Sequence, residues 1–191
     1  MFSKYDVYTT VQSLYCYPDS DVLKNKLNIR DRDELKRAEE EITALKQYML
    51  MESPIKGRFS KTQLMNIHRF LFEDIYPFAG LIRREQISKG DTMFYPPHLI
   101  GQELDEVFSK LHSEKMLHET DRKRQIEHLS YIMSELNIIH PFREGNGRSI
   151  RELIRCMALH YGFTLDWSRV DGIRCSMRRL GRWLMVGRFV M

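Results

Sequence analysis

His-Pro-Phe-Arg-Glu-Gly-Asn-Gly-Arg-Ser-Ile-Arg, residues 140–151, is the stretch that decides how the fold and function of this chain are interpreted. Pro141 ends the preceding helical pattern, because proline disfavours helical geometry in the residue before it. Gly145 and Gly147 let the backbone turn its N–H groups inward without obstruction from a Cβ. A helix beginning near Gly147 would add its positive end, so the stretch predicts a nest that binds an anion such as phosphate.

The side chains around this nest have the chemistry of phosphate transfer. Arg148 and Arg151 are three residues apart, so both reach over the anion with the planar fork that phosphate oxygens prefer. Glu144 has the carboxylate expected of a Mg²⁺ ligand, and Asn146 has a side-chain amide that donates to a phosphate oxygen. His140, with an ordinary pKa near 6.5, would accept a hydroxyl proton. A solvated loop is the favoured interpretation of any single residue, but the group as a whole predicts nucleotidyl or phosphoryl transfer.

Helical periodicity dominates the rest of the chain. Apolar residues spaced three and four apart predict a helix over 31–50 that begins with an Asp31–Glu34 capping box. Four further helices are expected at 60–72, 99–111, 122–139 and 147–161, the last ending at Gly162. The positions expected to face inward in the first helix are Leu35, Ala38, Ile42, Leu45 and Met49. The fold class is therefore all-α apart from one segment.

Residues 82–95 interrupt the helical rhythm. Residues compatible with β-strands flank Lys89-Gly90-Asp91, so a short hairpin is expected, and Pro96-Pro97 closes it. The chain is thus predicted to be a helical bundle with one short β-hairpin.

The motif resembles that of the Fic family. Residues His140, Phe142, Glu144–Arg148 and Arg151 occupy every fixed position of the family pattern. Residues 75–83 resemble the family segment Tyr-x-aromatic-Ala-Gly-x-x-Arg. Its flap hairpin is similar to Ile87, Ser88, Lys89 and Gly90 followed by Phe94. The resemblance covers about residues 20–167, and we assign 1–167 to a Fic domain.

The resemblance implies a Fic fold and a protein adenylyltransferase, which moves AMP from ATP to a Ser, Thr or Tyr hydroxyl and releases pyrophosphate. His140 would be the base and Glu144 the Mg²⁺ ligand. Gly145, Asn146, Gly147, Arg148 and Arg151 would bind ATP, and the flap would align the target as an added strand. Gly147 favours AMP transfer over phosphorylation, because related Doc kinases have lysine there. Other nucleotide donors, and a catalytically silent nucleotide-binding module, are the alternatives.

The resemblance also bears on control. The family's inhibitory pattern, [Ser/Thr]-x-x-x-Glu-[Gly/Asn], is not visible, since the only matching dipeptide is Glu144-Gly145 itself. The chain then resembles toxins of the family that a small separate antitoxin inhibits by supplying the glutamate. By analogy alone, the ATPase subunits of gyrase and topoisomerase IV are the expected targets.

Charge and cysteine content set the remaining expectations. The net charge of +4 comes from residues 168–191, which carry +5, while 1–167 is close to neutral. This basic tail fits the family poorly. Three interpretations of it remain open: a helix that docks a partner, a surface that binds nucleic acid or membrane, and an out-of-frame end. We expect no direct nucleic-acid or membrane partner.

Three scattered cysteines, with no signal peptide in view, favour a reducing, cytoplasmic location. The histidines outside the motif are assigned to surface or ordinary packing, and Glu39–Glu41 to a solvated helix face.

Overall fold

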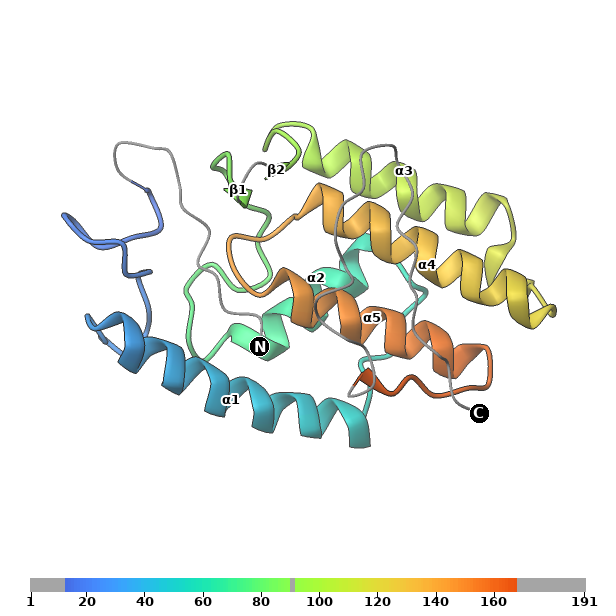
Figure 1. Ribbon diagram of the computed structural model, residues 1–191, viewed down its shortest axis with the longest axis horizontal. Coiled ribbons are helices and arrows are strands. Elements are labelled where there is room, and N and C mark those ends of the chain that lie inside the picture. The colour runs from blue at the N-terminus through green and yellow to red at the C-terminus, as the bar shows by residue number, and fades with distance from the viewer. Residues whose placement is uncertain (1–12, 90–91, 168–191) are drawn as a thin grey trace.

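The computed structural model describes residues 13–89 and 92–167, so the basic tail 168–191 and the flap residue Gly90 lie outside the described residues. Its elements, in chain order, are α1 (Arg32–Glu52), α2 (Lys61–Phe72), β1 (Ser88–Lys89), β2 (Thr92–Met93), α3 (Ile100–Ser113), a 3₁₀ turn (Met116–His118), α4 (Arg122–Ile139) and α5 (Asn146–His160). The strands form an antiparallel two-stranded hairpin. The predicted helical bundle with one small hairpin is confirmed (Figure 1).

Local sequence signals set the ends of the helices. The Asp31 carboxylate accepts a hydrogen bond from the Glu34 N–H at 2.8 Å, which caps α1 as expected. Ser60 caps α2 in the same way, and α4 ends before Pro141. Gly162 follows α5 with φ +80°, the left-handed conformation that stops a helix. The boundaries expected from capping residues are therefore close to those observed.

The core lies between α2, α4 and α5. Helix α5 packs against both α2 and α4, α3 covers the other side of α4, and α1 packs on α2 (Figure 1). The residues expected to face inward in α2 and α5 are completely buried: Leu64, Ile67, Leu71, Phe72, Ile150, Leu153, Ile154 and Met157. Within residues 13–89 and 92–167, no helix has the length and apolarity needed to cross a membrane. This core holds the α4–α5 connection, residues 140–145, at one end of the bundle.

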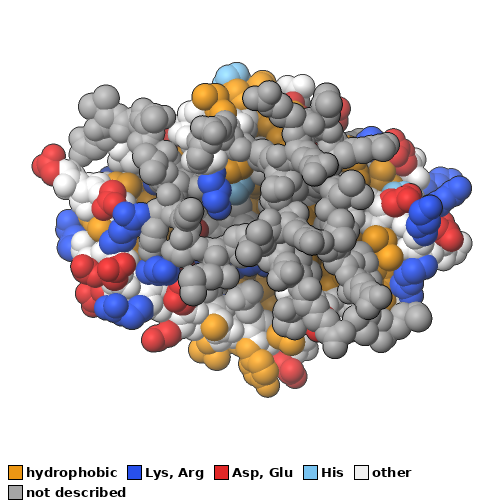
Figure 2. Space-filling view, viewed as in Figure 1, with side chains coloured by type: hydrophobic (Ala, Val, Ile, Leu, Met, Phe, Trp, Pro, Cys, Tyr) orange, Lys and Arg blue, Asp and Glu red, His pale blue; other side chains and the backbone are white. Residues whose placement is uncertain are grey.

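The inward face of α1 differs from the expected one. Leu45 and Met49 are 62% and 46% exposed, so the prediction that they face the core is wrong. The residues that α1 buries are Leu35, Thr43 and Leu50. Hydrophobic side chains gather along the lower edge in Figure 2, where Figure 1 places α1. The inward face of α1 also carries polar side chains, Glu39 and Thr43, which contact Arg148 in the first turn of α5.

Candidate active site

The α4–α5 loop is held in shape by its own residues. Asn146 accepts a hydrogen bond from the Phe142 N–H at 2.8 Å and donates one to the Phe142 carbonyl at 2.7 Å. The Phe142 ring is completely buried and stacks on His68 with 3.8 Å between ring centroids. One N–H and the oxygen of the Asn146 amide thus hold the loop closed, and the second N–H of that amide has no part in these two bonds.

Gly145 shows why glycine is needed in the nest. Its φ is +77°, and a Cβ at this position would overlap the ring of Phe72. The Gly145 N–H donates to the Glu144 carboxylate at 2.9 Å. A Cβ on Gly147 would lie 3.1 Å from the guanidinium of Arg151, so glycine at 147 keeps space beside that arginine. The turn expected at Gly145 is thus present as a left-handed residue, and Gly147 lies in the first turn of α5.

The two arginines of the motif have different surroundings. The Arg148 guanidinium forms ion pairs with Glu39 and Glu144 and donates to the Thr43 hydroxyl at 3.0 Å. Arg151 forms no hydrogen bond or ion pair with any residue that the structure describes, and burial together with the charge of Arg148 lowers its pKa. Arg151 is therefore a partly buried cation whose charge is not balanced by a described carboxylate, as a phosphate-binding side chain requires.

His140 has the tautomer that a base needs. It ends α4 with φ +50°, and its Nδ1–H donates to the Asn137 carbonyl at 3.2 Å. Since a carbonyl can only accept, Nδ1 carries the proton of the neutral ring and Nε2 keeps its lone pair. The Phe94 ring stacks on the imidazole at a centroid distance of 3.8 Å. Burial, followed by the charges of Arg83 and Lys89, lowers the pKa of His140 to about 3, although the bond to Asn137 opposes the shift.

Arg83 connects the base to the flap. It is 1% exposed, and its guanidinium donates to the backbone carbonyls of His140 at 2.8 Å, Glu85 at 2.6 Å and Tyr95 at 2.6 Å. Glu85 precedes the hairpin and Tyr95 follows it. One buried side chain therefore joins both ends of the flap to the backbone of the predicted base.

The flap itself is short. Its register pairs Ser88 with Met93 and Lys89 with Thr92. Ile87 is 1% exposed and anchors the first strand, and Phe94 turns inward onto the imidazole of His140. The hairpin edge thus lies next to the base, where a target segment would have to be held.

His68 is a site residue that the sequence analysis missed. This side chain is fully buried; its Nδ1 accepts from the Gly80 N–H at 2.7 Å, and its Nε2–H donates to the Glu144 carbonyl at 2.9 Å. Its role is more than ordinary packing, because it ties the Glu144 backbone to the segment after α2. Its place on the apolar stripe of α2, beside Ile67 and Leu71, is the signal of a histidine that needs buried partners.

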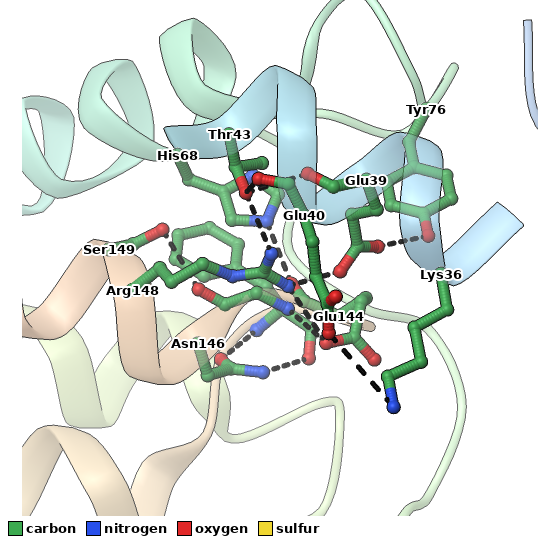
Figure 3. Close-up of polar contacts among 12 residues, drawn as sticks. Lys36, Glu39, Glu40, Thr43, His68, Tyr76, Glu144, Asn146, Arg148 and Ser149 are labelled. Atoms are coloured by element: carbon green, nitrogen blue, oxygen red, sulfur yellow. Dashed lines mark hydrogen bonds and ion pairs between the residues drawn. The ribbon is translucent and has the colours of Figure 1, made fainter. Parts of the chain in front are cut away.

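Glu39 corrects a second expectation. Its side chain is only 12% exposed and pairs with Arg148, so its assignment to a solvated helix face is wrong. The Tyr76 hydroxyl donates to the same carboxylate (Figure 3). Spacing of four residues between Leu35, Glu39 and Thr43 places all three on the face of α1 that turns toward the site.

The buried histidines predict acid-sensitive stability. Burial lowers the pKa of His68 from 6.5 to about 4 and that of His140 to about 3. As the pH falls from 6.5 toward 4, these two histidines become protonated in the unfolded chain but stay neutral in the native protein. The free energy of unfolding should then decrease by about 1.4 kcal/mol per pH unit for each histidine. Urea unfolding of the wild type between these pH values measures this slope.

The matched variants are His68→Gln, whose amide can still donate and accept, and His98→Gln at an exposed histidine. We expect the first to reduce the pH slope and the second to leave it unchanged. Equal slopes in wild type and His68→Gln would contradict the assignment.

Comparison with known proteins identifies the family. A sequence profile described as Fic/DOC family matches residues 58–158, which include the loop, both arginines and the flap. The chain belongs to the Fic/DOC family. Protein adenylyltransferase VbhT of Bartonella schoenbuchensis is 34% identical over 82% of this chain, which spans only 33% of VbhT. Probable protein adenylyltransferase Fic of Escherichia coli K12 is 33% identical over 82% of this chain and 78% of its own length.

Solved structures agree with the Fic fold. BepC of Bartonella tribocorum, solved with bound AMPPNP, has a TM-score of 0.75 and 23% identity, over 84% of this chain and 83% of that one. The likeness confirms the fold expected from the motif. The names of the curated Fic relatives agree with the predicted class of enzyme, protein adenylyltransferase.

Proposed function

We propose that this Fic protein transfers AMP from ATP to a hydroxyl side chain of a target protein and releases pyrophosphate. One observation carries the proposal: a single loop joins His140, whose neutral ring keeps the Nε2 lone pair, to the start of α5, where the Arg151 side chain has no ion pair with any carboxylate of the described residues. Relatives named protein adenylyltransferase support the choice of AMP as the transferred group.

The reaction is an in-line displacement at the α-phosphorus. The target oxygen forms a bond to phosphorus, the bond to the oxygen bridging the α- and β-phosphates breaks, and the pair of electrons leaves with pyrophosphate. The hydroxyl proton passes to Nε2 of His140. A bound polyphosphate raises the pKa of His140 toward its ordinary value, because negative charge favours the imidazolium ion. The base therefore becomes stronger when the donor is in place.

Glu144 is the residue that fits a Mg²⁺ ion. Its side chain is 34% exposed at the nest, and the Gly145 N–H orients one carboxylate oxygen. Residues 13–89 and 92–167 contain no cluster of three ligating side chains, so this part of the chain offers no closed metal cage. A single carboxylate combined with phosphate oxygens and water is the usual setting of Mg²⁺, which would neutralise charge on the phosphates.

Labelled nucleotides test the proposed reaction. Protein incubated with lysate, Mg²⁺ and ATP labelled at the α-phosphate should transfer the label to a protein band, whereas ATP labelled at the γ-phosphate should not. Label from the γ-phosphate alone would indicate phosphorylation instead. That result would contradict the expectation that Gly147, which leaves space beside Arg151, favours AMP transfer. Label from neither would support the silent nucleotide-binding module.

The finer expectations about biology are part of this proposal. A toxin held in check by a small antitoxin is supported by the resemblance to the toxin subgroup and by Arg151, with which a partner's glutamate would pair. The gyrase and topoisomerase IV ATPase subunits as targets rest on the family resemblance, and a cytoplasmic location rests on the three scattered cysteines. A structure of a native complex in which no partner glutamate approaches Arg151 would contradict the antitoxin proposal.

A further inference from the structure

Helix α1 contacts the active site through one carboxylate. Glu39 lies 109 residues before Arg148 in the chain, yet its Oε1 accepts from Nη2 of that arginine. Its Oε2 accepts from the Tyr76 hydroxyl, so both oxygens have a donor. The carboxylate is therefore fixed in orientation by these two contacts, which Figure 3 shows, and its side chain is only 12% exposed.

Other contacts hold the same guanidinium. Thr43, one helical turn after Glu39, accepts from Nη1 of Arg148 at 3.0 Å and donates to the Glu39 carbonyl at 2.7 Å. The guanidinium carbon lies 4.7 Å from the centre of the Phe72 ring. Arg148 is thus held by an ion pair and a hydroxyl from α1 and by an aromatic face from α2.

Arg148 lies between two carboxylates. Nη2 contacts Glu39 most closely, and the same nitrogen is 3.5 Å from Oε1 of Glu144. That Oε1 also accepts from the Gly145 N–H at 2.9 Å. Without Glu39, the Arg148 guanidinium could move closer to Glu144, and a closer ion pair there would reduce the negative charge of the carboxylate that would bind Mg²⁺.

We propose that Glu39 is a positioning residue of this site: it holds the Arg148 guanidinium against α1 and so sets how closely that guanidinium approaches Glu144, the carboxylate that would bind the metal of the nucleotide. The inference rests on the proposed function for the identity of the nucleotide. It gives α1 a direct part in preparing the site, although α1 lies outside the motif and outside residues 58–158, which the family profile matches.

Nucleotide binding with and without metal tests this role. Calorimetric titration with AMPPNP should show that Glu39→Gln weakens binding about ten-fold in the presence of Mg²⁺, the loss expected from one charge-assisted hydrogen bond. Without Mg²⁺, Glu39→Gln should weaken binding by a clearly smaller factor, because the Glu144 carboxylate then has no metal to hold. Equal or tighter binding by Glu39→Gln in Mg²⁺ would overturn the proposal, since a carboxylate that merely competed with phosphate would give that result.

Glu40 provides the matched control. It is the next residue of α1, but its side chain is 63% exposed and contacts only Lys36 at 4.0 Å among the described ion pairs. We expect Glu40→Gln to bind AMPPNP like the wild type. A loss equal to that of Glu39→Gln would indicate a general charge effect of α1 and overturn the proposal.

A second variant separates positioning from folding. Tyr76→Phe removes the other donor to Glu39 while leaving the carboxylate and Arg148 intact. It should weaken Mg²⁺-dependent binding by a smaller factor than Glu39→Gln, in protein whose circular dichroism matches the wild type. An unchanged affinity in both variants overturns the role of Glu39 whether or not AMP transfer is found. Conversely, a metal-dependent loss without any AMP transfer leaves that role intact and counts only against the proposed reaction.

Discussion

Replacing His140 by alanine is expected to reduce the rate of AMP transfer by at least about 100-fold, the usual contribution of a positioned general base. The residue contributes Nε2 as proton acceptor, and no other imidazole of the described residues lies in the α4–α5 loop. Initial rates of label transfer from ATP labelled at the α-phosphate measure the effect. Binding of AMPPNP should change little, because the nest is built from residues 144–148.

The control for this variant must allow for the backbone. His140 has φ +50°, where alanine is strained by about 1 kcal/mol, so some loss of stability accompanies its substitution. His140→Asn, which tolerates this conformation, should lose the same activity while keeping the wild-type melting temperature. Activity near the wild-type level in His140→Asn would remove His140 from the role of base.

Gly145→Ala is expected to have the largest effect on stability. Its φ of +77° strains any residue with a Cβ, and the added methyl would overlap the buried Phe72 ring. Strain and overpacking together should lower the free energy of unfolding by about 2–4 kcal/mol, as measured by urea unfolding. Affinity for AMPPNP should fall as well, because the loop that carries Glu144 must move.

The variant Gly162→Ala separates the effect of backbone strain from the effect of the contact with Phe72. Gly162 has φ +80°, but a Cβ there would meet nothing within 4 Å. Gly162→Ala should therefore lose only the strain energy, about 1–2 kcal/mol, and should bind AMPPNP normally. If Gly145→Ala were no more destabilising than Gly162→Ala, the contact with Phe72 would not be the reason for glycine at 145.

Much of the fold follows from local signals. The caps at Asp31 and Ser60, the helix-ending Gly162 and the apolar stripes of α2 and α5 are short-range features, and the helices form where these features predict them. The hairpin before Pro96 was equally local. The buried face of α1 could not be predicted from local signals. Leu45 and Met49 fit the helical periodicity just as well as the polar residues do, and it is the polar residues that turn inward.

The candidate site divides in the same way. Sequence by itself determined the loop, its glycines, the histidine and the two arginines, since a twelve-residue motif places these groups through the backbone geometry of one turn and one helix. Only the tertiary structure decided which arginine is already paired. The partners of Arg148 and of the loop backbone, Glu39 and His68, lie 109 and 76 residues away in the sequence. Their contacts depend on how α1 and α2 pack against α5, and no short-range pattern encodes that packing.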